Sequence, residues 1–116
     1  MSGRQAPEKR LQAACRLLAA LHGLRAWHLS QARATQQSAG LPDDLYTGGP
    51  RPLAVEYKAG RHAQTAAQAA FQAAWEASGG AYLVIRSVGA FVDALAAETA
   101  LRGAERAYGV SDAGGG

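Results

Sequence analysis

The sequence is poor in cysteine and has no long apolar run. Cys15 is the single cysteine among 116 residues, which excludes an internal disulfide and a cysteine-rich zinc site and fits a reducing compartment. The N-terminus has no apolar signal core, and no run of roughly 18 apolar residues occurs. We therefore expect neither export nor a membrane span, and we expect a cytoplasmic protein.

Lysine is also scarce. Only two of the twelve basic residues are lysines, Lys9 and Lys58, and the rest are arginines. Arginine is a permanently charged fork, whereas lysine is a compact cation that can titrate when partly buried and sit beside a nucleophilic water. A lysine at position 58 therefore suits catalysis.

Length and composition predict a single folded domain. An apolar content of 48% is ordinary for a globular chain of this size. We assign the domain to residues 1–110 and expect the glycine-rich residues 111–116 to form a disordered tail.

The net charge of +3 is unevenly distributed. Residues 1–72 hold nine basic and four acidic groups, whereas residues 73–116 hold three basic and five acidic groups. A basic region around a small acidic cluster suits a metal-dependent enzyme that acts on a polyanion. The alternative is that the positive charge serves only solubility.

Hydrophobic periodicity and turn residues predict an α/β fold with a small mixed sheet flanked by helices. Pro7 begins the first helix and Gly23 ends it, and Thr65-x-x-Gln68 forms a capping box at the start of a later helix. The expected elements are a helix from Pro7, strands at 24–30, 43–47 and 52–58, a helix at 65–78, a buried central strand at 81–86, and a helix after Ser87 whose apolar face carries Phe91, Val92, Leu95 and Leu101. A polar loop covers residues 31–40, and a helical crossover before residue 81 requires one parallel strand pair.

The most informative motif is Glu56-Tyr57-Lys58 at the end of a predicted strand, with Asp43 and Asp44 one strand upstream. Side chains two apart in a strand share a face, so a carboxylate and an ammonium lie side by side. Two carboxylates about 4 Å apart repel by about 4 kcal/mol at an effective dielectric of 20. A close Asp and Glu would therefore share a proton or bind a divalent cation.

The order of elements and four short stretches together resemble the restriction-endonuclease-like PD-(D/E)XK nucleases, and more narrowly the VRR-NUC family. The matching stretches are residues 40–45, 55–58, 65–71 and 79–88. The resemblance spans roughly residues 8–95 and implies a restriction-endonuclease-like core in the order α-β-β-β-α-β-α.

In the family, the aspartate and the glutamate bind Mg²⁺ or Mn²⁺ together with the backbone carbonyl of the residue between Glu and Lys, here Tyr57. The resemblance implies the same for Glu56 and one aspartate. It also implies that Lys58 orients or activates the attacking water. Pro42 favours Asp43 as the ligand and Leu45 favours Asp44. Adjacent residues of a strand point to opposite faces, and of the two we prefer Asp43.

Two further residues match positions near the metal site in the family. Gln68 corresponds to a motif position there, although its capping-box spacing from Thr65 also explains it. Glu8 corresponds to an acidic residue on the first helix, although a carboxylate in a first turn also complements the helix dipole. We include Gln68 among the catalytic candidates and Glu8 among the metal ligands.

Loop cations are the candidates for contact with DNA. They are Arg33, Arg51, Arg61 and His62. Such residues grip the phosphate backbone with salt-sensitive affinity, although an isolated surface cation is often only solvated. The aromatic residues Trp27, Phe71 and Trp75 are interpreted most simply as core or interface residues.

Together these features predict a Mg²⁺- or Mn²⁺-dependent DNA endonuclease. The resemblance implies a homodimer acting on branched or Holliday-junction-like DNA. The competing hypotheses are a catalytically inactive nucleic-acid-binding module on the same fold and a small α/β oligomerisation subunit.

Overall fold

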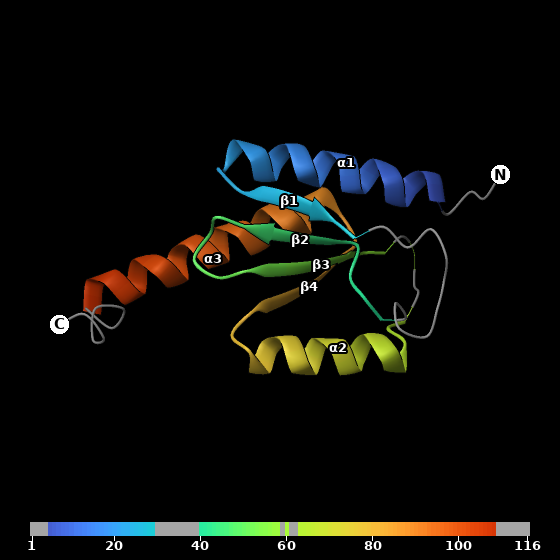
Figure 1. Cartoon of the computed structure of the whole chain (residues 1–116). Coiled ribbons are helices and arrows are strands. Elements are labelled where there is room, and N and C mark those ends of the chain that lie inside the picture. The colour runs from blue at the N-terminus through green and yellow to red at the C-terminus, as the bar shows by residue number, and fades with distance from the viewer. Residues whose placement is uncertain (1–4, 30–39, 59, 61–62, 109–116) are drawn as a thin grey trace.

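The computed structural model describes residues 5–29, 40–58, 60 and 63–108. The elements are α1 (Gln5–Leu21), β1 (Arg25–His28), β2 (Asp44–Thr47), β3 (Leu53–Tyr57), α2 (Ala66–Ala77), β4 (Ala81–Ile85) and α3 (Val88–Tyr108). This α-β-β-β-α-β-α order confirms the predicted fold class (Figure 1). Most of the predicted polar loop and the whole predicted tail lie outside the described residues.

The strands form one mixed sheet in the order β1-β2-β3-β4. The first three strands pair antiparallel, whereas β3 and β4 pair parallel through the α2 crossover. This arrangement confirms the predicted mixed sheet. It also gives β2 and β3 the central positions, where Asp44 and Glu56 lie.

One strand assignment was wrong: β4 is an edge strand and not a central one. Its apolar sequence has another cause. Ala81 and Ile85 are buried in the main core, and Tyr82 lies against Phe71 of α2, with ring centroids 6.2 Å apart. Helices on both faces bury a strand as thoroughly as neighbouring strands do, so apolarity alone did not reveal its position.

The helices divide between the two faces of the sheet. Helices α1 and α3 cover one face, and α2 covers part of the other (Figure 1). The core lies under α1 and α3, where Val55 of β3 packs in one cluster with Cys15 of α1 and Phe91 of α3. Helix α2 has no fully buried residue. The sheet face on the α2 side is therefore only partly covered.

Helix ends follow their predicted signals with small differences. Helix α1 begins at Gln5, before Pro7, and ends before Gly23, whose φ of +79° suits glycine. The Ser87 side chain accepts a hydrogen bond from the Ala90 N–H at 3.1 Å, so it caps α3 as predicted. Among the described residues, no helix combines the length and apolar content needed to cross a bilayer.

The predicted apolar face of α3 is only half buried. Phe91 is fully buried and Leu95 nearly so, whereas Val92 is 43% exposed and Leu101 41% exposed. Residues 91 and 95 are one turn apart and face the sheet, but residue 92 lies about 100° around the helix from residue 91.

Candidate active site

The two neighbouring aspartates lie at a distortion of the sheet. Asp44 is the register partner of Val55, and the Asp43 N–H also donates a hydrogen bond to the Val55 carbonyl at 3.0 Å. Two residues of one strand therefore face one residue of β3, which is the arrangement of a β-bulge. The bulge gives Asp43 and Asp44 different surroundings at the end of the strand.

Asp43 lies beside the end of β3. Its Oδ2 accepts a hydrogen bond from the Tyr57 backbone N–H at 2.9 Å. Burial raises the pKa of this carboxyl, and the charges of Asp44 and Glu8 raise it further, against the lowering effect of the Tyr57 hydrogen bond. Asp43 therefore faces negative charge and has little positive charge to compensate it.

Asp44 is fully buried and well compensated. Arg16 of α1 donates two hydrogen bonds to its carboxylate, at 2.9 and 2.7 Å. The Tyr57 hydroxyl donates to Oδ2 at 2.8 Å, and Gln12 and His28 contact Oδ1 at 3.2 and 3.1 Å. Burial opposes ionisation, but the Arg16, Tyr57 and His28 hydrogen bonds outweigh it and lower the pKa of Asp44.

Glu56 is a buried carboxylate with one oxygen unpaired. Glu56 is 7% exposed, and its Oε2 accepts a hydrogen bond from Gln68 Nε2 at 2.9 Å. Oε1 has no hydrogen-bond partner among the described residues. Burial first, and then the Asp43 charge, raise the pKa of Glu56 to about 7, although Lys58 lowers it.

Gln68 joins the site to the start of α2. Its Oε1 accepts hydrogen bonds from Lys58 Nζ at 3.1 Å and from the Thr65 backbone N–H at 2.9 Å. The Gln68 N–H in turn donates to Thr65 Oγ1 at 3.1 Å, which completes the predicted capping box. One side chain therefore caps a helix and holds Glu56 and Lys58 at fixed positions.

Glu8 lies near this array on the first helix. A cavity of about 180 Å³ is lined by Glu8, Lys9, Gln12, Asp43 and Tyr57. The Glu8 charge also contributes to the raised pKa values of Asp43 and Glu56. Helix α1 thus brings a third carboxylate toward the ends of β2 and β3.

The residues present fit a hard divalent cation. Within the described part of the chain, no three His, Cys, Asp or Glu side chains form a ready-made metal cluster. Mg²⁺ needs only one or two protein carboxylates, because it keeps several of its waters. The unpaired Oε1 of Glu56 and the undercompensated Asp43 are donors of that kind. Tyr57, between Glu56 and Lys58 in sequence, donates its N–H to Asp43.

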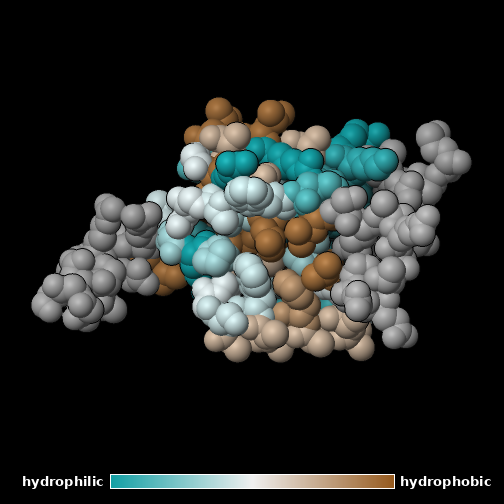
Figure 2. All heavy atoms as spheres, in the orientation of Figure 1, coloured by the Kyte–Doolittle hydropathy of each residue, from teal (hydrophilic) through white to brown (hydrophobic). Residues whose placement is uncertain are grey.

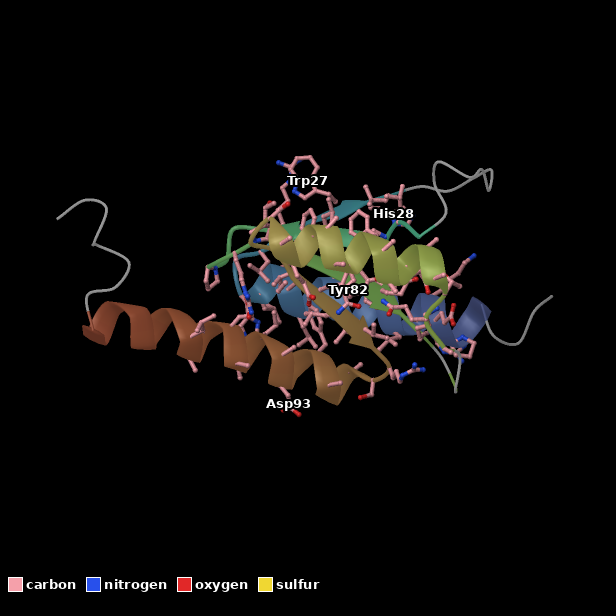
Figure 3. The ribbon with its side chains drawn as sticks, turned by 90° about the horizontal axis from the view of Figure 1, so that it is seen from below. Trp27, His28, Tyr82 and Asp93 are labelled. Carbon is pink, nitrogen blue, oxygen red and sulfur yellow. The ribbon has the colours of Figure 1, made fainter. Side chains whose placement is uncertain are left out.

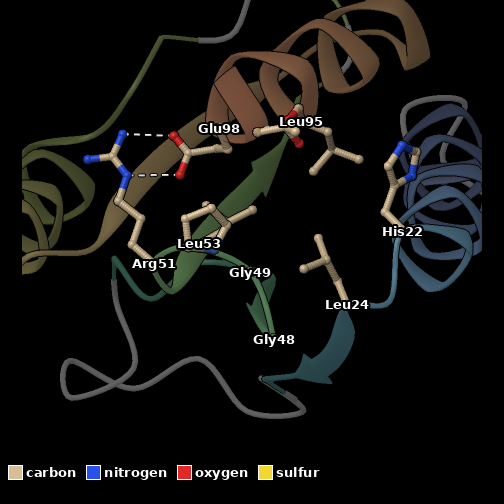
Figure 4. A pocket seen from close by; sticks show the side chains of 10 residues that line it. His22, Leu24, Gly48, Gly49, Arg51, Leu53, Leu95 and Glu98 are labelled. Atoms are coloured by element: carbon tan, nitrogen blue, oxygen red, sulfur yellow. Dashed lines mark hydrogen bonds and ion pairs between the residues drawn. The ribbon is translucent and has the colours of Figure 1, made fainter. Parts of the chain in front are cut away.

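Arg51 is the one predicted DNA-contacting residue that the described part of the chain includes, and it does not lie at this array. Arg51 precedes β3, so it lies at the opposite end of that strand from Tyr57, and it forms a bidentate ion pair with Glu98 of α3 at 2.8 Å (Figure 4). This pair borders a second cavity of about 200 Å³. Arg33, Arg61 and His62 lie outside the described residues.

Sequence reasoning missed the two α1 residues that bind Asp44. Gln12 and Arg16 are one turn apart, and Glu8 is one turn before Gln12, so the three form a polar stripe at helical spacing. The stripe lies beside the apolar positions Leu11, Cys15 and Leu18 and could have been recognised by the same periodicity.

Comparisons with known proteins agree with the geometry at the level of the fold. No protein-family profile matches the sequence, and no curated protein matches it either. Among solved structures, a chain described as a VRR_NUC domain superposes with a TM-score of 0.61 at 21% sequence identity. The match covers 75% of this chain and 91% of the other. The chain therefore has the fold of a VRR_NUC domain, as the sequence motifs predicted.

Proposed function

We propose that this protein is a metal-dependent nuclease that hydrolyses phosphodiester bonds in DNA. The VRR_NUC fold supports a nuclease, and the side chains at the ends of β2 and β3 support the chemistry. A fold by itself hosts many activities, so the activity depends on the side chains at the site.

The proposal depends on the buried Oε1 of Glu56, which has no hydrogen-bond partner within the described residues, and on the undercompensated carboxyl of Asp43 beside it. Burying a carboxylate oxygen without a hydrogen-bond partner costs free energy, and a purely structural role would not offset that cost. A divalent cation held by these carboxylates would remove the penalty. We assign Asp43 and Glu56 as the ligands, together with the Tyr57 backbone carbonyl and with Glu8 as an additional acidic group.

A bound Mg²⁺ or Mn²⁺ supplies Lewis-acid stabilisation of charge on a phosphoryl oxygen and makes a water more acidic. The Lys58 ammonium, held by Gln68 at 3.1 Å, places a fixed positive charge beside the carboxylates. That charge orients the attacking water and stabilises negative charge that develops at phosphorus. Hydrolysis joins the water oxygen to phosphorus and breaks one ester P–O bond, and the departing alcohol oxygen receives a proton.

Gln68 is a positioning residue in this proposal. Its amide donates to Glu56 and accepts from Lys58, so the two reactive side chains keep one relative orientation. Its own orientation is fixed by the capping box at the start of α2. Preorganisation of this kind reduces the rearrangement needed in the transition state.

The homodimer and the branched substrate come from the family resemblance, whereas the location and the DNA-contacting cations come from the cysteine content and the basic residues. We propose that the protein acts in the cytoplasm as a homodimer on branched DNA, because a small nuclease needs two active sites to cut both strands. Arg33, Arg61 and His62 are proposed to contact the DNA backbone near the site.

A cleavage panel tests the proposal. Purified protein is incubated with a four-way junction, a flap and a linear duplex, each with Mg²⁺, Mn²⁺ or a chelator. We expect cutting only with metal, and we expect Glu56→Gln and Lys58→Ala to abolish cutting while DNA binding survives.

Two outcomes would overturn the assignment. Variants that cut as well as the parent would show that the active site lies elsewhere. A parent that binds every substrate in a salt-sensitive manner and cuts none would support the inactive binding module, and absence of DNA binding at low salt would support an oligomerisation subunit.

A further inference from the structure

An exposed aromatic and cationic pair lies on the uncovered part of the sheet. Trp27 of β1 is 44% exposed, although the sequence suggested a core or interface position. Its Nε1–H donates to Thr47 Oγ1 at 2.9 Å, and the Arg25 guanidinium lies 4.1 Å from its ring centroid. Trp27 projects outward from β1 in Figure 3. The hydrogen bond and the cation–π contact therefore hold the indole in one orientation while 44% of the residue stays exposed.

Trp27 lies on the same sheet face as Glu56. His28 contacts Asp44 on the α1 side of the sheet, so its neighbour Trp27 points to the other side. In the strand register Trp27 is opposite Leu45, and Leu45 is opposite Ala54. Glu56 is two residues beyond Ala54, on the face where Gln68 of α2 contacts it. The aromatic pair and the proposed hydrolytic site therefore share one surface.

The separation between them suits a nucleic-acid strand. Two strand spacings of about 4.8 Å and one two-residue step of about 7 Å place the Trp27 and Glu56 Cα atoms about 12 Å apart. That distance corresponds to a few nucleotides of a strand. Figure 2 shows hydrophobic atoms at the surface over the strands, between the polar flank of α1 and α2.

We infer that Trp27 and Arg25 form a subsite for an unpaired nucleotide of the DNA substrate. The base stacks on the indole surface that Arg25 leaves open, and the guanidinium attracts the adjoining phosphate. Bases inside a duplex are already stacked on one another and do not offer a free face, so this subsite favours single-stranded or branched DNA. The inference rests on the proposed nuclease function and names the feature of the substrate that the site selects.

Binding measured without metal tests the subsite separately from cleavage. In the presence of a chelator, the full chain is titrated with a short oligothymidylate and with a blunt duplex. We expect Trp27→Ala to weaken oligothymidylate binding by about 10- to 100-fold. Duplex binding should change much less. Trp27→Phe should retain most of the affinity, because a ring remains. Leu17→Ala, at a 70% exposed apolar position on α1, is the matched control and should change neither.

Fluorescence gives an independent readout. In a Trp75→Phe variant, Trp27 is the single tryptophan of the chain, and stacking on a base should quench its emission upon oligothymidylate binding. The inference is overturned by unchanged affinity of Trp27→Ala, by equal losses for oligothymidylate and duplex, or by absence of quenching. It is also overturned if Trp27→Ala changes the sedimenting mass, since Trp27 would then contact a second copy of the chain.

The subsite and the proposed function can fail independently. Trp27-dependent binding without any cutting in Mg²⁺ or Mn²⁺ would retain the subsite and refute hydrolysis. Metal-dependent cutting with binding that does not depend on Trp27 would retain hydrolysis and refute the subsite.

Discussion

Asp44 and Glu56 are buried carboxylates on adjacent central strands, but their hydrogen-bond partners differ and their pKa values shift in opposite directions. Asp44 has hydrogen bonds from both arms of the Arg16 guanidinium and from the Tyr57 hydroxyl. In the part of the chain that the structure describes, Glu56 has one amide partner, Gln68, and its Oε1 has none. The pKa of Asp44 is lowered, whereas the pKa of Glu56 is raised to about 7.

The difference separates a structural charge from one available to a ligand. The hydrogen bonds of Asp44 connect α1 to β2, so its charge is already used to hold the fold together. Asp43 and Glu56 repel each other and lack an opposing cation at hydrogen-bond distance among the described residues. Adjacent aspartates in one sequence can therefore have entirely different roles, and their hydrogen-bond partners distinguish them better than their neighbours in sequence do.

Among the variants that test this comparison of carboxylates, a change at Asp43 should have the largest effect on cleavage. We expect Asp43→Asn to reduce metal-dependent cleavage by on the order of 10²–10³, because an amide is a weak ligand for a hard cation and the site loses charge that would hold it. Thermal unfolding in chelator should change little or shift to higher temperature, because one repelling charge is removed. If the variant cleaved as fast as the parent, Asp43 would not be a metal ligand, and Asp44 would become the candidate.

Asp44→Asn should act on stability. The amide nitrogen would face the Arg16 guanidinium, and a partly buried cation would lose its partner. We expect the free energy of unfolding, measured by urea denaturation, to fall by about 3 kcal/mol. This value is near the lower end of the range for breaking a buried ion pair, because Arg16 is partly exposed. Asp93→Asn, at an exposed aspartate of α3, is the matched control and should change it little. Unchanged unfolding of Asp44→Asn would contradict the structural role.

Glu56→Gln should change how stability depends on pH. The folded pKa of about 7 exceeds the ordinary value of 4.5, so ionisation opposes folding. The contribution of Glu56 to stability is complete below the unfolded pKa and is lost as pH rises through 7. Between pH 4 and pH 9, with chelator, the variant should therefore gain about 3 kcal/mol relative to the parent. Leu17→Ala, which alters no ionisable group, should show no such trend. A constant difference across that range would mean that Glu56 is solvated.

The candidate site was only partly predictable from sequence. Strand periodicity places Glu56 and Lys58 together, and the helix entry at Thr65 brings Gln68 to both of them. The choice between Asp43 and Asp44 was not predictable, because simple strand alternation does not include the bulge opposite Val55. Two partners of Asp44, Gln12 and Arg16, come from α1, which is far away in sequence. Helical periodicity reveals the polar stripe that holds them but not the strand residue that it contacts.

Fold prediction failed where two physical causes give the same pattern. The apolar run of β4 is the same whether strands or helices cover it, so its edge position was missed. Trp27 was interpreted as a core or interface residue, and its 44% exposure rules out the core and leaves the interface open. Coverage of a sheet face depends on where the helices lie and not on the sequence of the strand itself.

The smallest expected effect separates the two roles of Gln68. Thr65→Ala removes the side chain that caps α2 and should cost about 1 kcal/mol of stability. The Gln68 amide would still accept from the backbone N–H of residue 65 and from Lys58, so cleavage should stay close to that of the parent. Gln68→Ala should cost similar stability and also reduce cleavage about 10- to 100-fold, as expected for a group that orients ligands. If Thr65→Ala lost as much activity as Gln68→Ala, the capping box itself would hold the geometry of Glu56 and Lys58. The orientation of the Glu56 carboxylate would then depend on the end of α2.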